Sequence, residues 1–210
     1  MRKQYILIVL FIVGLIISAI NPHDYYTWIL EVFPAILGFI ILLLTYRSFR
    51  FTTLTYTFIL VHCYILFVGG HYTYSKVPLF NWIKEIVHQS RNNYDKIGHF
   101  AQGFVPALIV RELFVRLQVI NRKTWIPFLT VCVCMSISVF YEFLEWFVSI
   151  MSGESGDSFL GTQGYVWDTQ SDMLYAMIGA IAMIILLSRI QNKKISELLS
   201  LNEAAAFTTI

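Results

Sequence analysis

The sequence has little charge for its length. Only 13% of its 210 residues are charged, whereas 57% are apolar, and an average soluble domain carries about 25% charged residues. A chain of this composition would expose a large apolar surface to water, which excludes an ordinary soluble domain. The net charge of +2 is also too small for a nucleic-acid-binding protein, so we expect no nucleic-acid partner.

Cysteine is scarce as well. The three cysteines, Cys63, Cys132 and Cys134, all lie in apolar stretches. Residues two apart on a helix point about 200° away from each other, so Cys132 and Cys134 cannot readily pair. The sequence has no cysteine-rich or three-histidine ligand set of the kind that binds zinc. We interpret the cysteines as small buried apolar residues.

What the chain has instead is long apolar segments, and a helix needs about 20 mostly apolar residues to cross a bilayer. Six segments qualify: residues 4–21, 27–45, 51–70, 97–117, 125–150 and 168–188. We therefore predict an all-α integral membrane protein with a bundle of about six transmembrane helices. One polytopic domain would cover residues 1–200, followed by a short C-terminal tail at 201–210.

The loop between the third and fourth spans contains a second kind of helix. Between residues 78 and 89, apolar side chains recur at helical spacing with polar ones opposite. This pattern predicts a short amphipathic helix at the membrane interface. It would be either a simple connector or a lid over an outward-facing cleft.

Lysine and arginine are unevenly distributed among the loops. Ten lie on one side of the predicted bundle: Arg2, Lys3, Arg47, Arg50, Arg116, Arg122, Lys123, Arg189, Lys193 and Lys194. The other side has only Lys76, Lys84, Arg91 and Lys96. Because positive charge is retained on the cytoplasmic side, both termini are predicted to be cytoplasmic.

Acidic and histidine side chains gather toward the outer side of the predicted bundle. Insertion of one such side chain at the bilayer centre costs about 2.5–3.5 kcal/mol, so its presence in a span suggests a structural or functional role. They lie in the outer third of the spans or just outside: Glu31, His71, Asp95, His99, Glu142, Glu145, Asp168 and Asp172. On the last three spans they share one helical face each, which predicts an acidic, outward-facing pocket that contains His99.

The pocket residues have candidate roles. Acid–base catalysis would use His99, Glu142 and Asp95. Ligand binding would use Gln102, Glu145, Asp168, Asp172 and Trp167. A divalent metal ion, the one cofactor the sequence suggests, would be held by Asp172, Glu142 and His99.

Structural roles for the same residues remain open. Asp95 and Asp168 could cap the N-termini of their helices. Glu142 and Glu145 could make structural hydrogen bonds to a neighbouring helix. Glu112 and Arg116 are spaced i, i+4 near the cytoplasmic end and predict a structural ion pair. The glycine-rich loop before the last span, residues 153–167, is expected to fold back onto the mouth of the pocket.

Three motifs carry a resemblance that covers essentially the whole chain. They are the segment Tyr94–Ala107, the pair Glu142 and Glu145 followed by Trp146, and the segment Phe159–Met173. These motifs resemble the uncharacterised YjdF-like proteins of the bacterial inner membrane. The resemblance implies a multi-pass protein of the inner (plasma) membrane and carries no reaction with it.

A weaker resemblance points to the cell envelope. Asp95 with Lys96 and His99, a glutamate on the next helix, and Asp172 are similar to the VanZ-like pattern. That group includes proteins linked to glycopeptide-antibiotic resistance. The asparagine that this pattern has four residues after the aspartate is replaced by Ala176.

Three functions are compatible with these observations. The chain could be an enzyme that acts on a lipid-linked or cell-envelope substrate, or a non-catalytic protein that binds a lipid or an amphiphilic drug in the same pocket. It could also be a small transporter, although the ionisable residues do not trace a path across the bilayer. Membrane lipid is the expected partner in each case, and the sequence does not indicate an oligomeric state.

Overall fold

The described part of the chain is entirely helical. The computed structural model describes residues 2–152, 163 and 165–207, which form seven α-helices and no strand. The helices are α1 (Arg2–Ala19), α2 (Tyr25–Thr45), α3 (Thr53–Tyr72), α4 (Pro78–Ile86), α5 (Tyr94–Arg116), α6 (Ile126–Ser152) and α8 (Asp168–Phe207), with a 3-10 helix η1 (Lys123–Trp125) before α6. The predicted all-α fold is confirmed for these residues.

Each of the six predicted spans coincides with a helix, but hydropathy alone identifies fewer. Four helical stretches are long and apolar enough to cross a membrane: Tyr25–Thr45, Thr53–Tyr72, Lys123–Met151 and Asp168–Leu201. Helix α1 offers a shorter apolar stretch, Lys3–Ala19. Helix α5 is absent from this set because charged residues occupy both of its ends. The count of six spans therefore stays a prediction.

Two sequence expectations were wrong in detail. Helix α8 does not end at residue 188 but continues to Phe207, because the polar segment that follows the apolar one consists mostly of good helix formers. Cys132 is exposed rather than buried, whereas Cys63 and Cys134 are buried and all three are free. Hydropathy identifies the apolar part of a helix, and a helix can continue beyond that part into a polar segment, as α8 does.

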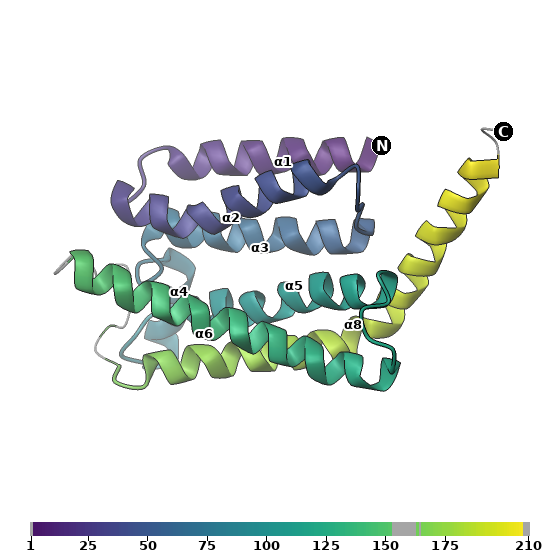
Figure 1. Cartoon of the computed structure of the whole chain (residues 1–210). Coiled ribbons are helices and arrows are strands. Elements are labelled where there is room, and N and C mark those ends of the chain that lie inside the picture. The colour runs from purple at the N-terminus through teal and green to yellow at the C-terminus, as the bar shows by residue number, and fades with distance from the viewer. Residues whose placement is uncertain (1, 153–162, 164, 208–210) are drawn as a thin grey trace.

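The helices form two groups joined through α3 and α5 (Figure 1). Helix α3 packs against α1 and α2 on one side and against α5 on the other, and α5 also packs against α6 and α8. Large apolar side chains on the outer faces are exposed, including Leu44 at 79% and Ile185 at 74%. Exposed apolar surface of this extent suits hydrocarbon rather than water.

The predicted amphipathic helix is present as α4. Leu79, Trp82 and Ile86 are exposed along it, and its N-terminus carries Pro78, which suits a first helical turn. Its placement at a membrane surface stays a prediction.

Helices α5 and α8 approach each other through glycine. A Cβ atom added to Gly103 on α5 would lie 1.7 Å from the carbonyl oxygen of Ala176 on α8. Reciprocally, a Cβ atom on Gly179 would lie 2.1 Å from the carbonyl oxygen of Phe100. Small residues allow this backbone contact, which is a common means of helix association in membranes.

At the other end of α5, a buried carboxylate ties this helix to the start of α3. Glu112 is fully buried and accepts hydrogen bonds from the backbone N–H of Thr52 at 2.8 Å and from the hydroxyls of Thr52 and Thr55 at 2.9 and 2.6 Å. Arg116 donates to the same carboxylate at 2.9 Å, which confirms the predicted i, i+4 pair. The four donors satisfy a charge that would otherwise be costly to bury.

The glycine contact gives a first prediction. Gly103→Ala should lower the stability of the folded protein by about 1–3 kcal/mol or more, because α5 and α8 must move apart to admit the new methyl group. Thermal unfolding of the purified protein in detergent measures this. Gly38→Ala is the matched control, since a Cβ atom at Gly38 meets no atom within 4 Å. Equal melting temperatures for the two variants would contradict the close contact.

A second prediction concerns the buried carboxylate. Glu112→Ala should destabilise the protein by about 3–5 kcal/mol, because it leaves Arg116 and the three donors of Thr52 and Thr55 without their acceptor. The same unfolding experiment applies, with Glu197→Ala as a control because Glu197 pairs with Lys194 at an exposed position. A small effect at Glu112, similar to that at Glu197, would show that water replaces the lost bonds.

Candidate functional site

Polar side chains from three helices meet at the end of the bundle opposite Glu112. Asp95, Lys96 and His99 come from the first turns of α5, Asp168 and Asp172 from the start of α8, and Glu142 from the second half of α6. Six side chains from distant parts of the sequence therefore form one cluster, which we call the polar site. Arg91, in the segment before α5, joins it through the ion pairs given next.

One half of the polar site is a network of ion pairs. Lys96 Nζ lies 2.6 Å from Asp172 Oδ1, 3.0 Å from Asp168 Oδ1 and 3.4 Å from Asp95 Oδ2. Arg91 pairs with Asp95 and, at 2.7 Å, with Asp168. All five side chains are largely buried, so each charge depends on the others for compensation.

The ion-pair network raises the pKa of the Arg91 guanidinium. Burial alone would lower the pKa of the Arg91 guanidinium, but its hydrogen bond to Asp168 and the charges of Asp95, Asp168 and Asp172 together raise the pKa above its usual value. Arg91 therefore remains a fixed positive charge at any physiological pH.

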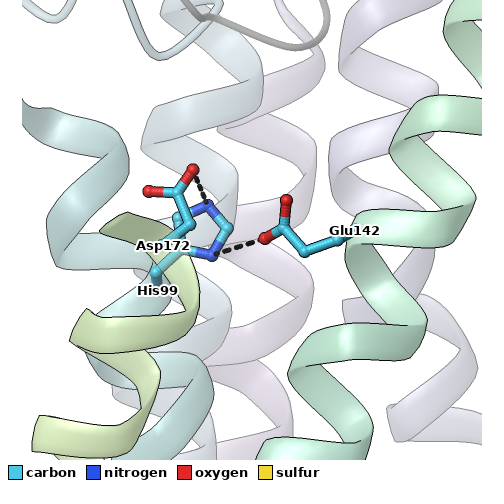
Figure 2. Close-up of side chains that lie close together, drawn as sticks. All are labelled: His99, Glu142 and Asp172. Carbon is cyan, nitrogen blue, oxygen red and sulfur yellow. Dashed lines mark ion pairs between the residues drawn. The ribbon is translucent and has the colours of Figure 1, made fainter. Parts of the chain in front are cut away.

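The other half of the polar site is a group of three potential ligands (Figure 2). His99 Nε2 lies 3.6 Å from Asp172 Oδ2, and His99 Nδ1 lies 4.0 Å from Glu142 Oε1. One nitrogen or oxygen atom from each residue lies within 4.8 Å of the other two. Asp172 belongs to both halves, because its second oxygen bonds Lys96.

Glu142 is buried without a complete set of partners. Only 7% of the residue is exposed, and its Oε1 atom has no hydrogen-bond partner among the described residues. Figure 2 shows the carboxylate directed at His99. The hydroxyl of Ser138, one turn earlier on α6, is also fully buried and has no hydrogen-bond partner in the part of the chain that the structure describes. Buried polar atoms are nearly always bonded, so these two mark an incomplete site.

Gln102 fixes the orientation of the His99 ring through a hydrogen bond. The amide Oε1 of Gln102 lies 2.9 Å from His99 Nδ1 and can only accept, so Nδ1 carries the proton. In the neutral ring, Nε2 is then an acceptor, and it faces the carboxylate of Asp172. Two acceptors facing each other are stabilised when a proton or a cation lies between them.

A second group of side chains holds the segment before α5 in place. Asn92, which is 1% exposed, donates its side-chain amide to the carbonyl oxygen of Val77 and to Asn81 Oδ1. Its backbone exchanges two hydrogen bonds with the side chain of Gln163. These bonds position Arg91 beside the aspartates.

The structure brings together most of the residues that the sequence indicated. His99, Glu142, Asp172, Asp95, Asp168 and Gln102 all lie in the polar site or bond directly to it. Capping does not describe Asp95, since α5 begins after Asn93 and the Asp95 carboxylate is bonded by Arg91. Whether any of these residues has the catalytic or binding role assigned above stays a prediction.

The ligand-binding roles of two further residues, Glu145 and Trp167, stay predictions. Glu145 lies one turn beyond Glu142 and contributes to no group of potential metal ligands among the described residues. Trp167 is 61% exposed. The glycine-rich segment 153–162, which was expected to cover the pocket, lies outside the described residues.

Sequence reasoning missed the cations and the amide of this site. Arg91 was counted only as a loop charge, although Arg91 and Asp95 have the i, i+4 spacing of an ion pair. Lys96 was noted in the VanZ-like pattern, but no pairing with the aspartates was predicted for it. Asn92 gave no comparable signal, because its bonds reach residues 11 and 71 positions away.

Comparisons with known proteins agree with the resemblance found in the motifs. No solved structure matches the chain. The inner membrane protein YjdF of Escherichia coli (strain K12) is 47% identical over 175 residues, which cover 83% of this chain and 84% of that protein. Residues 3–193 match the family described as "Predicted membrane protein (DUF2238)". The chain therefore belongs to the DUF2238 family of predicted membrane proteins.

Proposed function

We propose that this inner-membrane protein binds a divalent cation at the polar site and, through that cation, an anionic group of a lipid or cell-envelope component. The observation that carries the proposal is the convergence of His99, Glu142 and Asp172, together with a Glu142 oxygen that has no hydrogen-bond partner within residues 2–152, 163 and 165–207. The protein would be a binding protein whose specificity lies at one end of the bundle.

The charge balance supports a cation. The polar site holds four carboxylates, namely Asp95, Asp168, Asp172 and Glu142, but only two permanently charged cations, Arg91 and Lys96. With all four carboxylates ionised and His99 neutral, two negative charges remain uncompensated in a buried environment. A divalent ion would balance them.

The donor set also suits a metal. One imidazole and two carboxylates are ligands shared by manganese, zinc and iron. Gln102 would act as the outer partner that fixes the ring of a ligating histidine. An ion held by three protein ligands keeps positions open for other oxygen atoms, such as those of a phosphate group.

The proposal includes a topology with six spans and both termini in the cytoplasm. It rests on the ten positive residues at the end of the bundle where α5 meets the start of α3, against four at the end that holds the polar site. On this topology the polar site faces the outside of the cell membrane.

The third prediction tests this topology. A reporter that is active only in the cytoplasm should be active when fused after residue 200, and a reporter that requires export should be active when inserted next to Lys84 in α4. The ten positive charges are the reason for the expected orientation. An exported reporter that is active at the C-terminus would rule out an even number of spans with this orientation.

The fourth prediction tests the cation site. Purified protein should bind Mn²⁺ stoichiometrically, as measured by electron paramagnetic resonance and metal analysis. His99→Gln and Glu142→Gln should abolish tight binding, and Gln102→Ala should weaken it about 10- to 100-fold, as expected for an outer partner. The polar variants keep much of the side-chain volume, so they should melt close to the parent without metal.

Glu85→Gln is the matched control, because Glu85 is an exposed carboxylate outside the polar site. Unchanged Mn²⁺ binding in both His99→Gln and Glu142→Gln would reject the site. Failure of the parent protein to bind Mn²⁺, Zn²⁺, Mg²⁺ or Ca²⁺ would reject it as well. A sharply lowered melting temperature in metal-free variants would assign a structural role to the two residues instead.

A further inference from the structure

A second feature lies in the other half of the bundle. Helices α1, α2, α3 and α5 line a partly open cavity of about 230 Å³. Its lining is mostly aliphatic and aromatic, and it includes the mid-helix prolines Pro34 and Pro106. Proline bends a helix because its ring displaces the carbonyl of the preceding turn, and a bend leaves space beside a neighbouring helix.

The cavity is suited to hydrocarbon. An engineered apolar cavity of about 150 Å³ stays dry and binds benzene, so a larger one with an apolar lining is also unsuited to water. Leu43 lines the cavity and is also 51% exposed, so the cavity reaches the outer surface of α2 there. Helix α2 is one of the four helices long and apolar enough to cross a membrane. If α2 spans the membrane, this opening faces the acyl region of the bilayer.

Three of the polar side chains that line the cavity lie at one end, whereas a fourth, His62, lies near the middle of α3. Gln4, Tyr46 and Tyr56 belong to the start of α1, the residue after α2 and the first turn of α3, which lie at the same end of the bundle. The Gln4 Oε1 atom is buried and has no hydrogen-bond partner from any described residue. A ligand with an apolar tail and a polar head would match this distribution.

Positive charge surrounds that polar end. Lys3, Arg47 and Arg50 are exposed there, and none of them has a carboxylate within ion-pair distance among the described residues. The guanidinium of Arg50 lies over the ring of Tyr46, 4.9 Å from its centre, which places a cation beside the cavity lining. An anionic head group would be attracted to these charges, each of which contributes about 1 kcal/mol near an anionic surface.

We propose that this cavity is a binding site for an anionic phospholipid, with one acyl chain between α1, α2, α3 and α5 and the phosphate near Lys3, Arg47 and Arg50. The site is distinct from the polar site, because no residue of the polar site is among the residues that line the cavity. The proposal therefore stands whether or not the polar site binds a cation.

Gly38 provides a direct test. It lines the cavity, and a Cβ atom there would meet nothing within 4 Å, so a larger side chain can fill the space without moving the backbone. Gly38→Ala fills a small part of the cavity and Gly38→Leu fills more. Leu37→Phe is the matched control, since Leu37 is the next residue on the same helix and is 45% exposed on the outer face.

The experiment uses delipidated full-length protein in detergent, to which dioleoylphosphatidylglycerol or dioleoylphosphatidylcholine is added. Native mass spectrometry measures the bound lipid, and thermal unfolding verifies the fold of each variant. The parent and Leu37→Phe should retain phosphatidylglycerol. Gly38→Leu should bind it about tenfold more weakly or worse, because excluding even two methylene groups has an effect of that size. Gly38→Ala should lie between them.

The head-group assignment is tested by charge. Arg47→Gln and Arg50→Gln should each weaken binding of phosphatidylglycerol about fivefold, whereas Lys84→Gln at the opposite end should not. Phosphatidylcholine should bind more weakly than phosphatidylglycerol to the parent. If a folded Gly38→Leu variant binds lipid like the parent, the cavity is not the acyl-chain site. If both lipids bind equally and the arginine variants have no effect, the anionic head group is rejected.

Discussion

The contact between α5 and α8 is the constraint on which the arrangement of this protein depends. Two glycines, Gly103 and Gly179, let the backbones approach so closely that a single methyl group on either would overlap the opposite helix. Gly103 lies four residues after His99, and Ala176, which it contacts, lies four residues after Asp172. The helix contact therefore sets the separation of His99 and Asp172 directly, without relying on flexible loops. Functional groups are held more accurately on packed helices than on loops.

Helix α5 is also fixed at its other end, and the two anchors use different chemistry. Glu112 is held by donors from the start of α3, whereas Lys96 is held by carboxylates from α8 and from its own helix. Between these anchors α5 carries apolar residues, which pack against α3, α6 and α8. The central helix thus has ionic connections at its two ends and apolar contacts in its middle. This is why it fails a hydropathy test for a span although it is the most enclosed helix of the bundle.

The sequence predicted the part of the polar site that follows from helical periodicity. His99 and Gln102 on one helix, Glu142 on a second and Asp172 on a third share inward faces because 100° per residue places them there, and their proximity is confirmed. Periodicity cannot tell how far one helix slides or rotates against another, so it could not assign Lys96 to the aspartates. The cavity beside Gly38 was also beyond sequence reasoning. The sequence pattern of an apolar residue is the same whether its side chain faces a neighbouring helix, a cavity or lipid.

The two oxygens of Asp172 serve different partners, Lys96 on one side and His99 on the other. A substitution at this position alters both halves of the polar site at once, so its effect cannot be added to that of a change at Lys96 or His99. Natural variation at the three positions is therefore expected to be concerted. In a relative that lacks Lys96, we expect one of the aspartates to be replaced as well. Such paired replacements, seen when diverged relatives are compared, indicate that the side chains are in contact.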